Sequence, residues 1–473
     1  MTPFATTAPV RARRSETVLA VVLCVATGGY SVLQSLVVPA LGVLEDALGT
    51  TPNGTAWILT AYLLSASILT PVIGRLGDLY GKKRALVGAL VALCLGAGVS
   101  ALADTLAVML AGRVVQGAGG AVFPLAFAMV RDEFRPNRRT AVVAAISAVL
   151  SAGGALGTVV AGPIVTLLDY HWLFWLPALV TAAAALAALI AVPGEDGVRA
   201  GHRPPVGWVS AGLLSGWLTL LLLAITYLPG ALPTLPLAVG AAVVAGIWWR
   251  VESTSRHPLL DLRTLRLPAV RVTNLATVLL GYGMFSAWML IPLMLQQSPD
   301  SGIGLGADLT GVGLYMLVPT AGTLLVTPFV GRLARSRGTR FPLWLGGLLA
   351  GLAYLALAWF GWAGGPGGPL VLCGIILVEG AGIGLAFAAV AVSVVESVPA
   401  DQAGVVSGVN TVMRTTGGTL GSTVAGTTLA AITGPAGEPG APAYLLAFTL
   451  CAAALLGTAA VGRRLPVAPV SQP

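Results

Sequence analysis

The stretch GGALGTVVAG, residues 153–162, recurs as GGTLGSTVAG at residues 417–426, a shift of 264 positions. Both copies lie in long apolar runs, where small residues let two helices approach closely in lipid. Two further pieces recur in the same order, at shifts of 257 and 263 positions. Gly74-Arg75-Leu76 with Gly81 matches Gly331-Arg332-Leu333 with Gly338, and residues 116–119 resemble residues 379–382. Three matches at nearly one offset predict an internal duplication.

The composition places both copies in a membrane. Of the 473 residues 56% are hydrophobic and 9% are charged, whereas a soluble domain carries about 25% charged residues. Apolar runs of about 20 residues, enough to cross a hydrocarbon core of about 30 Å, recur along the whole chain. We therefore predict an all-α membrane protein with fourteen spans. They are residues 17–41, 55–74, 85–103, 105–130, 140–168, 172–192, 208–228, 233–249, 272–296, 309–331, 342–362, 369–395, 404–432 and 443–462.

The basic residues test this count, because cytoplasmic loops of membrane proteins carry an excess of Lys and Arg. With a cytoplasmic N-terminus, 24 of the 26 basic residues fall in inner segments and none falls in an outer loop. The remaining two, Arg113 and Arg414, lie within spans. Adding or removing one span would scramble this segregation. Orientation thus explains the net charge of +8, and the sequence predicts no nucleic-acid partner.

The duplication and the span count together predict the domain organisation. Matched pieces lie eight spans apart, an even number, so the two copies have the same orientation: a parallel repeat of six-helix bundles. The predicted segments are a cytoplasmic tail (1–16), an N-terminal bundle (17–192), two inserted helices (208–249), a cytoplasmic linker (250–271), a C-terminal bundle (272–462) and a second cytoplasmic tail (463–473). Two bundles facing each other are typical of transporters, whose site lies at the interface and opens to one side at a time.

Several motifs resemble those of the major facilitator superfamily. Residues 74–84 resemble its signature loop, Arg113-x-x-Gln116-Gly117 its second motif, and residues 153–163 its antiporter motif. The inserted pair with the following residues 257–262, and residues 407–418, resemble the fourteen-span branch of drug:proton antiporters. The resemblance covers residues 17–464. It implies the major facilitator fold and proton-coupled export of drug-like molecules by alternating access.

The 74–84 loop combines three glycines, Gly74, Gly77 and Gly81, with a basic cluster suited to an anionic membrane surface. We expect the glycines to form a tight turn. A plain positive-inside turn explains the bases but leaves the lone acid, Asp78, unexplained. The resemblance implies that Arg75 and Asp78 latch the cytoplasmic side shut, with Arg332 as the counterpart of Arg75 in the second bundle.

Three charged residues lie deep within predicted spans: Arg113, Arg414 and Glu379. A charge at the bilayer centre costs roughly 2.5–3.5 kcal/mol on insertion scales, so such residues usually face the bundle interior. Glu379 is placed to load and release a proton, and a pair with either arginine is possible. The alternatives are a permanently paired structural glutamate and arginines that only bind backbone carbonyls. The family motif favours proton coupling.

The antiporter-motif helix combines Gly153, Gly154, Gly157 and Gly162 with Pro163. Glycines allow close packing against a neighbouring helix, and a proline can bend the span. The family usually has Gly-Pro at the position of Gly157-Thr158. In this chain the proline comes later, at Pro163, so the sequence does not fix where the helix bends.

Span 1 departs from the branch, because many of its members carry an aspartate where this chain has Leu33-Gln34-Ser35. Gln34 can form hydrogen bonds but cannot titrate, so Glu379 has to carry more of the proton coupling. One acid fewer also weakens the case for strongly cationic drugs. The residues predicted to line the cavity are Tyr30, Gln34, Trp57, Tyr62, Gln116, Trp288, Phe387 and Asn410.

The predicted function is proton-coupled export of drug-like or antibiotic molecules by a monomeric protein of the bacterial cytoplasmic membrane, with both termini inside. Two alternatives are export of an endogenous metabolite or lipid-like product and a non-transporting scaffold or receptor. The four cysteines lie in apolar runs without ligand spacing, and no nucleotide loop or nucleophile–base pattern occurs. We therefore expect no metal, no cofactor and no enzymatic activity; the expected partners are a small-molecule substrate, protons and lipid.

Overall fold

The computed structural model describes residues 16–37, 39–50, 52–192, 207–226, 231–255, 262–301, 303–363, 368–396, 403–432 and 439–465. These residues are almost entirely helical and form no β-strand, which confirms the predicted all-α class. Residues 257–261, part of the segment that resembles the fourteen-span branch, lie outside the described part of the chain. So do most residues of the two tails.

Two series of helices cover the two predicted bundles. The first is α1 (Glu16–Leu36), α2 (Leu41–Ala47), α3 (Pro52–Tyr80), α4 (Lys82–Ala101), α5 (Leu106–Gln116), the 3-10 helix η1 (Gly117–Ala121), α6 (Val122–Glu133), α7 (Pro136–Leu167) and α8 (Trp172–Ala191). The second is α12 (Pro268–Gln296), η2 (Pro299–Ser301), α13 (Leu309–Arg337), α14 (Arg340–Trp362), α15 (Gly368–Glu396), α16 (Ala403–Ala431) and α17 (Ala441–Gly462). Between them lie α9 (Trp208–Thr226), α10 (Ala231–Thr254) and the short α11 (Leu262–Arg266).

Thirteen stretches of the described chain are long and apolar enough to cross a membrane. Each matches one predicted span, and α5, η1 and α6 together form one of them. The remaining predicted span, 404–432, coincides with α16, which has 29 residues but is rich in Ser, Thr and Gly. The count of fourteen thus stays a prediction that depends on α16. A polar helix of this length needs shelter from lipid, and α16 finds it between α12, α3, α6 and α9.

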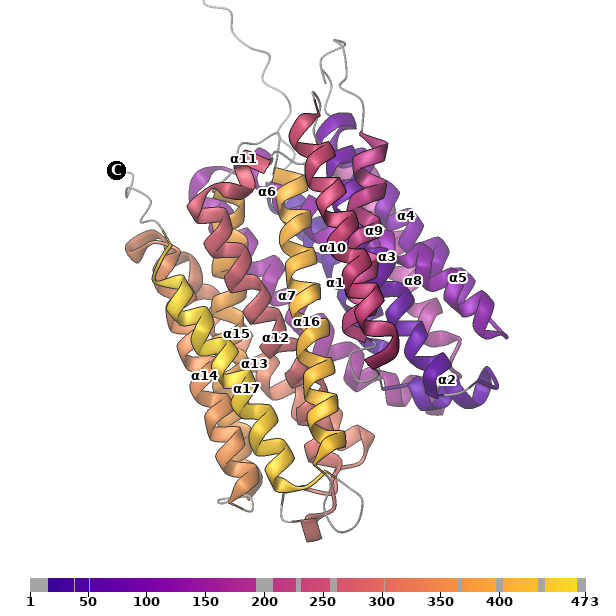
Figure 1. Ribbon diagram of the computed structural model, residues 1–473, viewed down its shortest axis with the longest axis vertical. Helices are drawn as coiled ribbons and strands as arrows, with labels where there is room; N and C mark the ends of the chain where they lie inside the picture. The colour runs from indigo at the N-terminus through magenta and orange to yellow at the C-terminus, as the bar shows by residue number, and fades with distance from the viewer. Residues whose placement is uncertain are drawn as a thin grey trace, which may run out of the picture.

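The helices of the two series pack in matching pairs (Figure 1). In the first, α1 packs on α7 and α4 on α8; in the second, α12 packs on α16 and α14 on α17. The series meet through α3 against α16 and α7 against α13, which are equivalent pairs under the duplication. Of the inserted helices, α9 lies against α3 and α16, and α10 packs on α9. The structure thus has the predicted two bundles and an added helix pair.

The predicted turn at residues 74–84 is wrong in its extent. Helix α3 continues to Tyr80, so Gly74 and Gly77 are helical, and the chain turns only at Gly81, where φ is +105°. Gly77 is needed for packing instead, because a Cβ at this position would lie 2.6 Å from Leu125 of α6. The apolar pattern ends at residue 74, but the helix extends beyond the apolar layer.

Replacing Gly81 by Ala should lower thermal stability. A side chain in this region of backbone space is strained by about 1–3 kcal/mol, which should lower the unfolding midpoint of the detergent-solubilised protein by several degrees. Gly88→Ala is the matched control, because it lies within α4 and a Cβ there has no neighbour within 4 Å. That variant should unfold at or above the parental temperature. Equal midpoints for the two variants would contradict the assigned turn.

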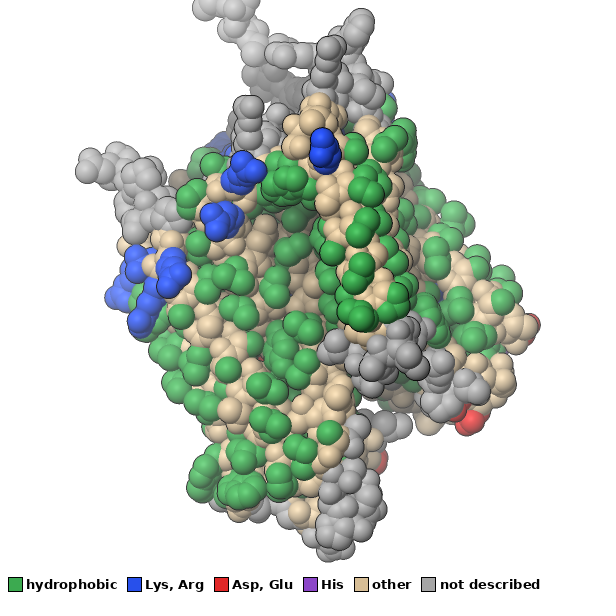
Figure 2. Space-filling model, viewed as in Figure 1, with side chains coloured by type: hydrophobic (Ala, Val, Ile, Leu, Met, Phe, Trp, Pro, Cys, Tyr) green, Lys and Arg blue, Asp and Glu red, His purple; other side chains and the backbone are tan. Residues whose placement is uncertain are grey.

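The two ends of the helices differ in charge (Figure 2). On the face shown, Lys and Arg side chains lie towards the end that carries α11, and acidic side chains lie near the other end. The helix junctions α3–α4, α6–α7 and α13–α14 all belong to the basic end. At the basic end, the Glu16 carboxylate forms ion pairs with Arg135 and Arg138, each with a nitrogen–oxygen distance of 3.6 Å. At the other end, His171 lies between Asp104 and Asp169. The alternation of helix directions thus reproduces the charge segregation expected from the sequence.

Candidate functional site

Two cavities lie between the bundles and share one wall. The first has a free volume of about 20 Å³ and is formed by α1, α3, η1 and α7 of the N-terminal series with α12 and α16 of the C-terminal series. The second also has a free volume of about 20 Å³ and is formed by α6, α12, α15 and α16. Thr411 and Arg414 of α16 line both cavities. The polar helix α16 is therefore the common wall.

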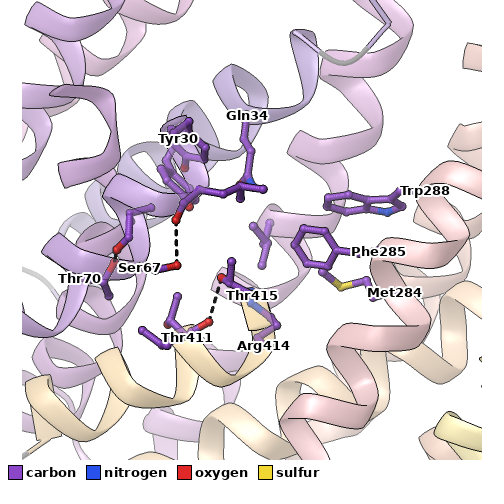
Figure 3. A pocket seen from close by; sticks show the side chains of 16 residues that line it. Tyr30, Gln34, Ser67, Thr70, Met284, Phe285, Trp288, Thr411, Arg414 and Thr415 are labelled. Carbon is purple, nitrogen blue, oxygen red and sulfur yellow. Dashed lines mark hydrogen bonds between the residues drawn. The ribbon is translucent and has the colours of Figure 1, made fainter. Parts of the chain in front are cut away.

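The first cavity has an apolar side and a polar side (Figure 3). Phe285 and Trp288 of α12 form the apolar side, with ring centroids 5.2 Å apart. Opposite them lie Ser67 and Thr70 of α3. Four predicted residues, Tyr30, Gln34, Tyr62 and Trp288, line this cavity.

The second cavity is mostly aromatic and aliphatic. Its walls include Phe123, Phe127 and Phe387. One of its polar residues, Asn410, donates through Nδ2 to Asn274 Oδ1 at 3.0 Å and to Thr277 Oγ1 at 2.8 Å. Asn410 thus ties α16 to α12, and its amide is already engaged within the protein. Of the predicted cavity residues, Phe387 and Asn410 belong to this cavity.

Trp57 and Gln116 line neither cavity. Trp57 is half-buried near the start of α3, and Gln116 is fully buried at the end of α5. The sequence also missed several lining residues, including Met284, Phe285, Thr411 and Thr415. In a span, these residue types look like ordinary packing residues. The sequence feature that could have indicated these residues is the high Ser, Thr and Gly content of α16. A polar helix of this kind is expected to face other helices or a cavity and not lipid.

Arg414 is 9% exposed, and its guanidinium lies 5.2 Å from the centroid of the Phe387 ring. Its Nε is buried without a hydrogen-bond partner, and among the described residues the side chain makes no ion pair. Gly281 of α12 holds the backbone of Arg414 close, because a Cβ at 281 would collide with the Arg414 carbonyl group. The guanidinium is therefore positioned beside both cavities by close helix packing, with its hydrogen-bonding capacity left open.

Arg113 lies elsewhere and is bound on several sides. It is fully buried, its Nε donates to the Ile58 carbonyl at 3.1 Å, and one terminal nitrogen donates to Gln116 Oε1 at 2.7 Å. Gln116 in turn donates to Ser100 Oγ at 3.0 Å. The guanidinium also lies 4.6 Å from the Tyr62 ring centroid. Arg113 thus joins α3, α4 and α5 and backs a side chain that lines the first cavity.

Glu379 lies within the C-terminal bundle, outside both cavities. It is 5% exposed, and its Oε1 lies 3.3 Å from the hydroxyl oxygen of Tyr354 on α14. The same hydroxyl lies 3.0 Å from the Gly283 carbonyl oxygen on α12. Within the described residues Glu379 forms no ion pair, so the structure pairs it with neither Arg113 nor Arg414. The acid is connected instead to α12, which carries cavity residues Met284 and Phe285.

The predicted gate residues lie at the basic end of the helices. Arg75 and Asp78 are half-buried on the last turns of α3, and Arg332 is exposed on α13. Within the signature motif, Lys82 at the start of α4 forms an ion pair with Asp132 at the end of α6. Between the bundles, Arg335 of α13 donates to the backbone carbonyl of Asn137 on α7 at 3.4 Å.

The antiporter-motif helix α7 packs closely on α1. Ser31 Oγ donates to the Leu150 carbonyl at 2.5 Å, and Ser35 Oγ lies 3.2 Å from the Gly153 carbonyl. Cβ atoms at Gly153 and Gly157 would collide with these serines, and one at Gly154 would touch Trp288 at 3.5 Å. Gly162 has open space around it, and α7 continues past Pro163 to Leu167.

A family model described as Major Facilitator Superfamily matches residues 23–422. The chain belongs to this superfamily. The chain superposes on a crystal structure of the human organic anion transporter MFSD10 with a TM-score of 0.68. The two chains are 16% identical, and the match covers 95% of this chain and 100% of the other. The fold of that transporter is therefore shared.

Three bacterial proteins are among the relatives of this chain. The chain is 28% identical over 86% of its length to an uncharacterized MFS-type transporter of Mycobacterium tuberculosis, and it spans only 57% of that protein. It is 29% identical to the cephamycin export protein of Amycolatopsis lactamdurans, over 87% of this chain and 83% of the relative. It is 30% identical to the uridine/deoxyuridine transporter of Lactococcus lactis, over 68% of each chain.

Proposed function

We propose that this chain is a proton-coupled secondary active transporter that exports drug-like or antibiotic molecules by alternating access. The observation that carries the proposal is the pair of cavities between two similarly built bundles, each cavity lined from both sides. Ligand sites between rocking bundles are the usual design for such folds. Ligand pockets have volumes of roughly 300–1,000 Å³, so a cavity of about 20 Å³ has to widen to admit a drug-like molecule, and alternating access supplies that movement. The cephamycin exporter among the relatives supports the direction and the substrate class.

The basic end of the helices is proposed to face the cytoplasm of a bacterial cell, with the protein acting as a monomer. Loops that carry Lys and Arg remain on the cytoplasmic side during insertion. The described basic clusters at α3–α4, α6–α7 and α13–α14 share this end. The inner gate then comprises Arg75 and Asp78 on α3 and Arg332 on α13, together with the contact between Arg335 and Asn137 across the two bundles.

Glu379 is the proposed proton carrier, and Tyr354 connects it to the cavity wall. The Tyr354 hydroxyl has one proton and two neighbouring acceptors, Glu379 and the Gly283 carbonyl. An ionised Glu379 can only accept, so it competes with Gly283 for that proton. A protonated Glu379 can donate to Tyr354, which frees the tyrosine to donate to Gly283. Loading a proton thus changes a hydrogen bond on α12 beside Met284 and Phe285.

A second candidate function is transport of nucleosides. The uridine/deoxyuridine transporter and the cephamycin exporter have nearly the same sequence identity to this chain, 30% and 29%, although the first matches a smaller share of it. The first cavity offers stacking surfaces at Phe285 and Trp288 together with the amide of Gln34, which are suitable contacts for a base. This candidate has the same fold and mechanism but another substrate.

The proposed function can be tested in proteoliposomes with an imposed pH gradient, using two labelled cephamycins and labelled uridine. Since each pH unit supplies about 1.4 kcal/mol per proton, one-to-one exchange should support roughly tenfold accumulation per unit. We expect accumulation of at least one antibiotic that collapses when a proton ionophore is added. Accumulation of uridine alone would favour the second candidate. Fluxes equal to those of empty liposomes for all three compounds would contradict transport of these classes.

A further inference from the structure

The two cavities together hold one charged side chain, and it is a cation. Neither the sixteen residues that line the first cavity nor the twelve that line the second include an Asp or a Glu. Arg414 belongs to both. A ligand in either cavity therefore meets a positive charge that no lining carboxylate balances.

The second observation is that the Arg414 side chain is about nine-tenths buried but has few polar partners in the protein. Its known contact is the Phe387 ring, and within the described chain its side chain has neither a hydrogen bond nor an ion pair. A buried charge without a counter-charge is costly, and buried guanidinium groups are normally paired. A guanidinium presents a planar fork of donors that matches a carboxylate or a sulfonate. The Arg414 guanidinium is thus chemically suited to bind an anionic group of a ligand.

Arg113 provides the contrast, because it is buried at least as deeply but is held by protein. Ile58, Gln116 and the Tyr62 ring contact its guanidinium. One terminal nitrogen, Nη2, is buried without a hydrogen-bond partner, but the side chain lines neither cavity. Arg113 and Arg414 therefore differ in their hydrogen bonds to the protein and in their position relative to the cavities. The comparison assigns ligand recognition to Arg414 and positioning of Tyr62 to Arg113.

The remaining polar groups of the first cavity define where else a ligand can bind. The hydroxyls of Ser67, Thr70, Thr411 and Thr415 donate to carbonyls of their own helices, at 2.8, 2.5, 3.0 and 3.1 Å. Their oxygens are left as acceptors. Among the described residues the buried Tyr62 hydroxyl has no hydrogen-bond partner, so it can donate its proton to a ligand. The donors are thus Tyr62 together with Arg414 and Gln34, which lie on different sides of the cavity (Figure 3).

We propose that the ligands of this cavity are amphipathic organic anions. The carboxylate or sulfonate binds Arg414, and an aromatic or apolar body lies against Phe285 and Trp288. Hydroxyl or amino groups of the ligand can donate to the threonine oxygens of α16. The proposal deepens the proposed transport function and rests on it, because it names the substrate class of the same site. It excludes cationic drugs, which would have to share the cavity with the guanidinium.

The test is equilibrium binding to the purified protein in detergent, without any gradient, so that it is separate from transport. Three bicyclic probes of nearly equal size differ only in charge: 2-naphthoate (anion), 2-naphthamide (neutral) and N-methylquinolinium (cation). Binding is followed by isothermal calorimetry at neutral pH. We expect 2-naphthoate to bind at least about tenfold more tightly than each of the other two. Equal or tighter binding of N-methylquinolinium, or no detectable binding of 2-naphthoate, would overturn the proposal.

Variants then assign the preference to one residue. Arg414→Gln should bind the anion and the amide equally, and Arg414→Lys should restore part of the preference. The matched control is Arg463→Gln, because Arg463 also lies 5.2 Å from an aromatic ring centroid, that of Trp344, but lines neither cavity. It should keep the parental preference. A folded Arg414→Gln variant with undiminished anion preference would overturn the assignment. If that variant does not fold, the three-probe comparison on the parent protein still decides the substrate class.

Transport failure and binding failure lead to different conclusions. Anion binding without gradient-driven accumulation would leave this inference standing and remove the proton-coupled function. Gradient-driven accumulation of cations with no anion binding would support the proton-coupled function and remove the inference about anionic ligands.

Discussion

Glu379→Gln should abolish proton-driven accumulation while leaving ligand binding intact. Gln has nearly the same shape and still contacts the Tyr354 hydroxyl, so packing around a side chain that is 5% exposed is preserved. It cannot load or release a proton. Accumulation driven by a pH gradient of one unit should therefore fall from roughly tenfold towards equilibration, a loss of about 1.4 kcal/mol of coupling. The measurement is the ratio of internal to external substrate in proteoliposomes.

Glu252→Gln is the matched control for this prediction. Glu252 is another buried glutamate, 2% exposed, but it lies on the inserted helix α10 and is hydrogen-bonded by Ser210 of α9. That variant should accumulate substrate like the parent. Similar losses in both variants would point to general damage, and undiminished accumulation by Glu379→Gln would remove Glu379 from the coupling mechanism. Exchange of substrate across the membrane without a gradient should persist in both.

Gly421→Leu should prevent the C-terminal bundle from packing. A Cβ at this position would lie 2.6 Å from Ser286 Oγ and 2.9 Å from Tyr282 Cα, so α16 would have to move away from α12. Overpacking a tight core typically costs 1–3 kcal/mol, and here much of the clash is with backbone. Most of the protein should be lost from the monodisperse peak in size-exclusion chromatography. The same substitution at the equivalent Gly157, where α7 meets Ser35 of α1, should behave alike.

Gly374→Leu on α15 is the control for the packing prediction. This glycine is exposed on its helix, and a Cβ there meets no atom within 4 Å. The variant should yield as much monodisperse protein as the parent. If Gly421→Leu also gave a parental yield, the close approach of α12 and α16 would be contradicted.

The sequence predicts the fold well because membrane insertion imposes simple rules. Each long apolar run becomes a helix, and the segregation of Lys and Arg determines helix direction. The repeated glycine motifs also have a direct physical counterpart, since Gly157 and Gly421 occupy equivalent contacts with Ser35 and Ser286. Helix ends are predicted less well. The run from residue 55 loses its apolar character at Gly74, yet α3 continues to Tyr80 because helices extend into the interface.

The candidate site is harder to predict, because side-chain partners depend on helix rotation. The depth of Arg113, Arg414 and Glu379 along their spans does not reveal which way each points. The structure places them in three separate environments: a hydrogen-bonded joint, a cavity wall and the interior of one bundle. The partner of Glu379, Tyr354, could not be deduced, since a tyrosine in a span is ordinarily read as a packing or interfacial residue.

Alternating access driven by Glu379 is the central claim, and distances across the two ends of the interface test it most directly. Spin labels at Asn137 and Arg335 report on the basic end, where α7 and α13 touch. Labels at Thr166 and Thr310, both exposed on the same two helices, report on the other end. The four native cysteines are first replaced by serine. Distances are measured by pulsed electron paramagnetic resonance in lipid nanodiscs on either side of neutral pH.

We predict that one distance lengthens as the other shortens when the pH is changed, and that Glu379→Gln keeps one arrangement at both pH values. Two distances that lengthen together, or a pH response that Glu379→Gln retains in full, would contradict the mechanism.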